Sequence, residues 1–366
     1  MPAKNGYLLI ADLSGYTAYL TSTELEHASG VIKGLLDVLV SRLGDPTHLW
    51  RLEGDAVLAY TTDPNFPDGN TFLTICEDMY NGFRERRLNM HANSTCECRA
   101  CAQVLDLDLK IFVHHGEFEE MEIGPMRDIS GTDAILVHRL AKTKVRESTG
   151  IKSCAVISQA AFDEMKAPKG LVPYSESIEH FGKVKMHVHD LDAVWQKLHA
   201  ERERVFSRAE EGLWTHEFEV NLPPSVMWEF LVTPALRRQW QDMIDVTVSA
   251  DIDRPALGAQ YHCVHKLAEF TSWVVDWEPF QYLSNRFLNA LHPHLSHYET
   301  YVLTANEDGT TSVRYTMGPM FDPETPDSGP FPSEDTELST IYRDCMTPWF
   351  VDLSKKIASE SRGAYS

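Results

Sequence analysis

The chain has 366 residues, which exceeds one ordinary domain and favours two domains, each large enough to bury its own core. Lys and Arg number 33, Asp and Glu number 54, and the net charge of −21 argues against nucleic acids and anionic membranes as partners. No apolar run approaches the roughly 20 residues of a membrane span, and the odd cysteine count, seven, favours reduced thiols or metal ligands, so we expect a cytoplasmic protein.

The first predicted elements are a strand, a helix and a hairpin. The apolar run over residues 7–11 predicts a strand that ends at Asp12. Apolar residues at three- and four-residue steps predict a helix over residues 32–43. Residues 49–60 then predict a hairpin of two apolar strands with Gly54 and Asp55 at the turn.

Asp12 and Asp55 each stand at the end of an apolar strand, and this pattern has two interpretations. If the two carboxylates meet in space they can hold a pair of magnesium ions, because hard cations favour carboxylate oxygen. Alternatively, Asp12 caps a following helix and Asp55 is an ordinary turn residue.

The remainder of the first half alternates strands and helices. We expect a helix over residues 72–87, a strand over 107–114, a helix over about 133–144 and a closing strand over 181–189. This order favours an α+β sandwich, in which a sheet has helices packed on one face.

The second half has a different order of predicted elements. It follows a charged segment in which apolar residues recur at helical spacing. We expect domains at 1–192 and 213–366, joined by a linker helix over 193–212. The second half should contain the following elements in order: a strand over 216–222, a helix from Pro223 and Pro224 to about Trp240, several strands, a loop over 321–335 and a long helix over 340–359.

The segment from Asp12 to Thr17, Asp-Leu-Ser-Gly-Tyr-Thr, resembles the metal-binding segment of class III adenylate and guanylate cyclases. Gly54 and Asp55 resemble the second metal motif of that family, and the similarity covers roughly the first half of the chain. The resemblance implies a ferredoxin-like nucleotidyl cyclase α/β sandwich. It also implies that Asp12, Leu13 and Asp55 hold two Mg²⁺ or Mn²⁺ ions per site, and that Gly15 and Thr17 contact the nucleotide.

A third cyclase motif supplies an Asp that contacts the base and an Arg that stabilises charge on the phosphates. Asp128 and Arg139, eleven residues apart, keep both residue types and the spacing. The structural alternative is a turn residue and a surface salt bridge. Two positions depart from the family: its ribose-orienting Asn corresponds to Ile135, and its adenine-reading Lys corresponds to Arg51.

The cyclase resemblance implies attack of a ribose 3′-hydroxyl on the α-phosphorus of a nucleoside triphosphate, ATP in the first place, giving a 3′,5′-cyclic monophosphate and pyrophosphate. Asp12, Asp55 and Arg139 would be catalytic, Arg51 and Asp128 would bind the base, and the family's shared sites imply a homodimer. An alternative is a binding protein whose cyclase fold has lost turnover, because the Ile135 side chain cannot form the hydrogen bond that the Asn makes.

The element order of residues 213–366 resembles the START-like or polyketide-cyclase-like helix-grip fold, in which a curved sheet wraps the C-terminal helix. That resemblance implies a small apolar ligand in the C-terminal domain, which would regulate the cyclase domain or be carried as a lipid or metabolite. A further alternative places catalysis of the polyketide-cyclase type in this half, with the first half regulatory.

His91, Cys96, Cys98 and Cys101 place four zinc-type ligands within eleven residues, enough for one tetrahedral structural Zn²⁺. The spacing matches no paired zinc-finger signature, and the alternative is three reduced thiols in a loop.

Overall fold

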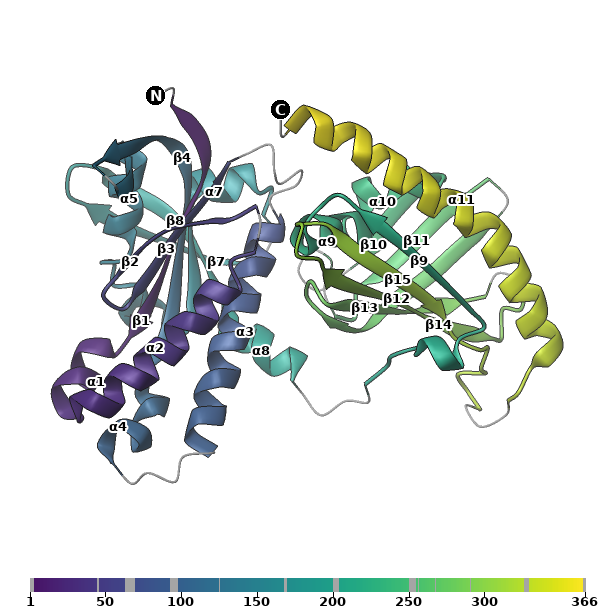
Figure 1. Cartoon of the computed structure of the whole chain (residues 1–366), viewed down its shortest axis with the longest axis horizontal. Helices are drawn as coiled ribbons and strands as arrows, with labels where there is room; N and C mark the ends of the chain where they lie inside the picture. Colours follow the sequence, from purple (N-terminus) through teal and green to yellow (C-terminus); the bar gives the residue numbers. More distant parts are fainter. Residues whose placement is uncertain are drawn as a thin grey trace. The chain divides into compact units, whose positions relative to one another are not determined.

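The structure is a computed structural model that describes residues 3–44, 46–62, 70–92, 98–124, 126–167, 170–199, 204–249, 255, 257–266, 268–289, 291–325 and 329–364. Its internal contacts divide the chain into a first unit, Met1–Ala200, and a second unit, Glu201–Ser366 (Figure 1). Among the described helices, none combines the length and the apolar character needed to cross a bilayer.

The first unit is built on a mostly antiparallel sheet with the order β2-β3-β1-β4-β6-β8-β7, in which β4 and β6 are parallel and β5 pairs only with β4. The strands are β1 (Lys4–Ser14), β2 (His48–Glu53), β3 (Ala56–Thr62), β4 (Asp108–Ile123), β5 (Met126–Ser130), β6 (Cys154–Ser158), β7 (Val172–Ile178) and β8 (Gly182–Asp190). Strand β1 lies inside this sheet, which is why its apolar run is continuous and not alternating.

Helices cover both faces of the first unit's sheet, whereas the sequence predicted helices on one face. They are α1 (Tyr16–Ser22), α2 (Leu25–Ser41), α3 (Asn70–Ala92), α4 (Arg99–Ala102), α5 (Thr132–Leu140), α6 (Val145–Thr149), α7 (Gln159–Glu164) and α8 (Leu191–Leu198). On one face, Leu8 and Ile10 pack with Val137 and Leu140 of α5. On the other face, the Tyr7 ring stacks on Phe72 of α3, 4.9 Å between centroids, and α3 packs beside α2 (Figure 1). Because successive residues of a strand point to opposite faces, the apolar run of β1 supplies both cores.

The second unit is a seven-stranded antiparallel sheet with the order β10-β11-β12-β13-β14-β15-β9, and the long helix α11 runs along it (Figure 1). The strands are β9 (Trp214–Val220), β10 (Met243–Ser249), β11 (Gln260–His265), β12 (Glu269–Glu278), β13 (Tyr282–Leu288), β14 (Ser296–Ala305) and β15 (Thr311–Met317), and the helices are α9 (Pro224–Val232), α10 (Pro234–Trp240) and α11 (Pro332–Ala364). Phe350 of α11 is fully buried, and its ring stacks on His216 and Phe218 of β9. The unit is therefore a sheet-on-helix layer with an aromatic core.

The continuous linker helix expected over residues 193–212 is wrong. Helix α8 ends at Leu198, residues 204–208 have no helical structure, and a short 3₁₀ turn covers Ala209–Glu211. The Val205 amide donates to the buried Asp276 carboxylate at 3.0 Å, and the Ser207 amide donates to Thr300 Oγ1 at 3.0 Å. These amides bond to the second unit's sheet, so they are not available for a helix.

Candidate functional site

The structure places Asp12 beside Asp55, at the point where β1 meets the β2–β3 turn. Asp12 pairs in register with Ala56 of β3, and the Leu13 amide donates a hydrogen bond to the Asp55 carbonyl at 3.3 Å. On its other side Asp12 pairs with Lys110 of β4. Two residues that are 43 positions apart in the sequence are therefore neighbours across one ladder, with a lysine on the next strand.

The electrostatics of this corner are those of two carboxylates forced together. Burial, and then the charge of Asp55, raise the pKa of Asp12 from 3.8 to about 6, against the opposing charge of Lys110. Burial also raises the pKa of Asp55. Both groups lose solvation, and one of them feels the like charge of the other.

The donor set at this corner fits a hard divalent cation. Ser14 lies on the same face of β1 as Asp12, and its buried hydroxyl has no hydrogen-bond partner among the described residues. Two carboxylates and a hydroxyl are oxygen ligands of the type that Mg²⁺ and Mn²⁺ prefer, and a cation would offset both the lost solvation and the repulsion by Asp55 that raise the pKa of Asp12. Leu13 buries its side chain, so it can offer such an ion only its backbone oxygen.

Gly15 and Thr17, which were predicted to contact the nucleotide, follow directly on this corner. Gly15 caps α1 with φ of 89°, a left-handed conformation, and a Cβ there would lie 3.0 Å from the Asp106 carbonyl oxygen. Both constraints favour glycine. Thr17 is exposed in the first turn of α1.

The two predicted base-contacting residues, Arg51 and Asp128, form an ion pair. An Arg51 nitrogen lies 3.0 Å from one Asp128 oxygen, and the Trp50 indole donates to the other oxygen at 2.8 Å. A second nitrogen of Arg51 pairs with Glu53. Although burial opposes it, the Ile129 amide, the Trp50 indole and the charge of Arg51 hold the pKa of Asp128 below its usual range. The site thus presents a donor and an acceptor side by side, at present bonded to each other.

Ile135 and Arg139 lie four residues apart on α5, and therefore on the same face of that helix. Ile135 is 55% exposed, which is unusual for a large apolar side chain. Within the described residues Arg139 makes no ion pair, and the structure does not bring it into contact with Asp12 or Asp55.

The sequence interpretation missed two contributors to this region. Lys110 stands opposite Asp12 only because β1 and β4 pair, and those strands are almost one hundred residues apart in the sequence. Trp50 could have been predicted to lie here, because it stands next to Arg51 in the first strand of the predicted hairpin.

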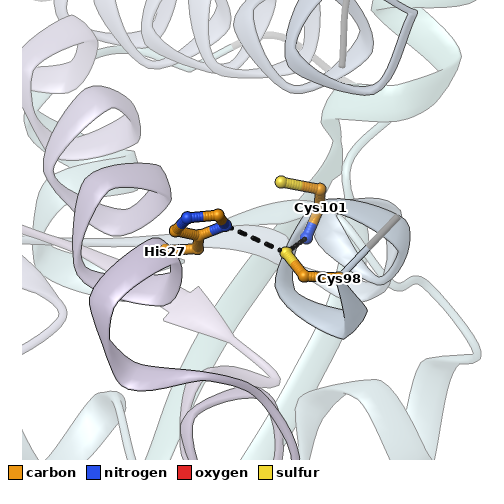
Figure 2. Close-up of side chains that lie close together, drawn as sticks. All are labelled: His27, Cys98 and Cys101. Atoms are coloured by element: carbon orange, nitrogen blue, oxygen red, sulfur yellow. Dashed lines mark hydrogen bonds between the residues drawn. The ribbon is translucent and has the colours of Figure 1, made fainter. Parts of the chain in front are cut away.

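The predicted zinc ligands divide in the structure. Cys98 and Cys101 lie together, but their histidine neighbour is His27 of α2, and the three ligand atoms lie within 4.8 Å of one another (Figure 2). His91, in the last turn of α3, is exposed and does not belong to this group, which corrects the prediction. Cys96 falls outside the described residues.

The second unit buries several polar side chains between its sheet and its helices. His297 and Glu299 of β14 have side chains 0% and 1% exposed, and His297 Nε2 lies 3.2 Å from Glu299 Oε1. Arg237 of α10 is buried over the Tyr261 ring, 4.5 Å from its centroid. Among the described atoms, one oxygen of Glu299, one nitrogen of Arg237 and both polar atoms of Asn285 have no hydrogen-bond partner. Buried groups of this kind are normally satisfied, so they are candidates to bind a polar ligand.

Sequence comparison finds relatives for part of the chain. Residues 32–149 match a family described as "Protein of unknown function (DUF2652)". The protein "Uncharacterized protein Rv2561/Rv2562" of Mycobacterium tuberculosis is 31% identical over 146 residues, which make up 39% of this chain. The chain spans 66% of the length of that relative.

Several solved structures are similar to about half of the chain. The guanylyl cyclase domain of the RhoGC fusion protein from Blastocladiella emersonii is 16% identical, with 51% of this chain and 97% of that chain covered and a TM-score of 0.36. The adenylyl cyclase CyaB from P. aeruginosa is 14% identical, with 52% and 95% covered and a TM-score of 0.37.

Proposed function

We propose that the first unit is a nucleotidyl cyclase-like domain that converts a nucleoside triphosphate, ATP in the first place, into a 3′,5′-cyclic monophosphate and pyrophosphate. The observation that supports this proposal most is the convergence of Asp12 and Asp55 at one sheet corner, with Ser14 on the same face of β1 as Asp12. A partly buried pair of like charges is costly unless a cation or a proton compensates it.

Each candidate residue has a distinct role in this proposal. Asp12 and Asp55 would hold two Mg²⁺ or Mn²⁺ ions, which when bound favour ionisation of the ribose hydroxyl and neutralise phosphate charge. Arg51 and Asp128 would exchange their mutual bonds for the base, since adenine offers an acceptor and an amino donor on one edge. Lys110 would add positive charge beside Asp12, which favours a triphosphate at this corner.

The proposal requires a second copy of the chain. Arg139 has no partner within its own described chain and stands on the face of α5 that carries the exposed Ile135. Strand β2 is an edge of the sheet and exposes Leu49 and Leu52, 45% and 52% of their surface. A homodimer that brings Arg139 to the partner's carboxylates would cover such apolar surface and complete the site.

The test is product formation by the purified full chain with Mn²⁺ and each of the four common triphosphates. Asp55→Asn should abolish the product while preserving side-chain size. The matched control, Asp37→Asn, removes an exposed carboxylate of α2 and should leave activity unchanged. Absence of a cyclic product for all four triphosphates removes the enzymatic claim.

A second candidate function is nucleotide binding without turnover, and Ile135 favours it. This side chain cannot orient a ribose by hydrogen bonding, and a lost hydrogen bond of that kind costs about 1–3 kcal/mol. Binding that depends on Mn²⁺ and on Asp55, without any product, would establish this candidate over the first.

For the second unit we propose a START-like, helix-grip ligand-binding domain. The aromatic side chains packed against α11 favour an apolar ligand. The ligand would also carry a polar group, because Glu299, His297 and Arg237 are buried polar side chains of the same unit. Such a ligand would regulate the cyclase activity of the same chain. Native mass spectrometry of freshly purified protein tests the binding, because a retained ligand adds a discrete mass. A chain that carries no added mass, and whose activity no lipid extract alters, contradicts this role.

A further inference from the structure

The group His27, Cys98 and Cys101 is a second cluster of metal-ligand side chains, separate from the Asp12 corner in its chemistry and in its residues. His27 comes from the first turn of α2, and the cysteines flank the two residues Arg99 and Ala100 at α4. Figure 2 shows the imidazole and both thiols directed toward one another. Two segments more than seventy residues apart thus supply one nitrogen and two sulfur ligands.

The distances suit a tetrahedral metal. His27 Nδ1 lies 3.1 Å from Cys98 Sγ, and all three ligand atoms lie within 4.8 Å of one another. Tetrahedral zinc, with Zn–S near 2.3 Å and Zn–N near 2.0 Å, separates its ligand atoms by about 3.5–3.8 Å. Only small side-chain adjustments separate the observed arrangement from a zinc-bound one.

Hydrogen bonds from residues outside the cluster fix the turn between the two cysteines, as is usual for the ligands of metal sites. The Cys101 amide donates to Cys98 Sγ at 3.5 Å. The Tyr19 hydroxyl donates to the Ala100 carbonyl at 2.7 Å, and the Ala100 amide donates to Glu24 at 3.2 Å. Both backbone groups of Ala100, the residue before Cys101, are therefore fixed by Tyr19 of α1 and by Glu24, which precedes α2.

The ligand types of this cluster differ from those of the Asp12 corner, since the cluster offers one imidazole and two thiols. Soft sulfur and imidazole nitrogen favour zinc over Mg²⁺ or Mn²⁺, so this cluster and the Asp12 corner would select different ions.

We propose that His27, Cys98 and Cys101 bind one zinc ion that joins the start of α2 to the segment leading into β4. The ion is structural. The segment it holds continues to Asp106, whose carbonyl oxygen lies against Gly15, so the zinc site supports the loop that follows Asp12. The described residues supply three of the four ligands of a tetrahedral ion.

The test is the zinc content of the full chain purified without chelator, measured by plasma mass spectrometry. We expect one zinc per chain, and a loss of that zinc in Cys98→Ser combined with Cys101→Ser and in His27→Ala. His91→Ala and Cys345→Ser are matched controls, an exposed histidine and an exposed cysteine outside the cluster, and both should retain the metal.

A spectroscopic measurement keeps the proposal testable if a variant fails to fold. Wild-type protein stripped of zinc and titrated with Co²⁺ should develop thiolate-to-cobalt absorption and the intense visible bands of a tetrahedral site. Hydrogen exchange of α1 should become faster on stripping and recover with zinc. A chain that lacks zinc as purified and gives only octahedral cobalt spectra overturns the proposal. So does a Cys98–Cys101 disulfide, seen as a mass loss of two hydrogens, which would indicate a redox pair.

Discussion

Replacing Asp12 with Asn tests the like-charge pair directly in metal-free protein. The pKa of Asp12 is raised from 3.8 to about 6, so the folded protein holds this proton more tightly than the unfolded chain does. The free energy of unfolding therefore falls as the pH rises from about 4 to about 6 and stays lower above that range. The full shift corresponds to about 3 kcal/mol, and water at this partly exposed carboxylate reduces the effect to roughly 1–2 kcal/mol.

We therefore expect Asp12→Asn to stabilise the first unit without metal by roughly 1–2 kcal/mol at about pH 7.5, and by much less at about pH 4.5, where Asp12 is already protonated. Urea unfolding of the full chain, with hydrogen exchange of β1 peptides as the readout, separates the first unit from the second. Mn²⁺ should stabilise the wild type and leave Asp12→Asn unchanged. Asp37→Asn is the control for loss of a surface carboxylate. Equal stability of wild type and Asp12→Asn at both pH values would refute the reasoning, as would equal stabilisation of both by Mn²⁺.

Three further predictions concern turnover, assembly and the second unit. Ile135→Asn should raise the rate of cyclic nucleotide formation about 5- to 150-fold, the equivalent of about 1–3 kcal/mol, and an unchanged rate would show that the ribose is oriented by another group. Mixing the Asp55→Asn protein with the Arg139→Ala protein, each inactive alone, should restore roughly a quarter of wild-type activity, because about half of the dimers are heterodimers and each has one intact site of two. No restoration would place both residues in the same subunit's site. Glu299→Gln should abolish retention of any co-purified ligand, because it replaces a buried carboxylate oxygen that has no hydrogen-bond partner among the described residues. Unchanged retention, measured by native mass spectrometry, would show that Glu299 does not contact the ligand.

Local signals predicted the hairpin and the long helices. Gly54 adopts φ of 62° at the β2–β3 turn, and the strands on either side lie within a residue or two of their predicted ends. Glycine at a tight turn between apolar runs is a short-range signal, so its structural outcome depends little on the rest of the chain.

Element lengths were predicted less well, because tertiary pairing sets them. Strand β4 continues to Ile123, well beyond the predicted end at residue 114, since Glu119–Ile123 pair with β5. That extension is acidic, and its apolar residues Phe118, Met121 and Ile123 do not keep one two-residue step, so periodicity gives only a weak signal for it. Helix α11 begins at Pro332, inside the segment predicted to be a loop, where proline occupies the first turn.

The zinc ligands illustrate the same limit for a site. Cys98 and Cys101 were predicted as zinc ligands because they lie close together in the sequence, and His91 was predicted for the same reason. The actual neighbour, His27, lies 71 residues before Cys98 and reaches it only because the N-terminal end of α2 packs beside α4. A sequence pattern can nominate ligands from one segment, but it cannot supply a ligand that only the fold brings close.

The acidic composition of the chain constrains how a triphosphate could bind. With a net charge of −21, the protein repels a polyphosphate at long range, and Asp12 and Asp55 repel it at short range. Lys110 alone cannot reverse the sign of a corner that holds two carboxylates. Bound divalent cations can reverse that sign, so in the proposed mechanism metal and nucleotide must favour each other's binding by the same factor.

The Arg51–Asp128 ion pair adds a second requirement, because it must open before a base can take its place. Only a ligand that offers both a donor and an acceptor replaces both of its bonds. The same groups that weaken binding of simple anions therefore select for a metal-bound nucleotide.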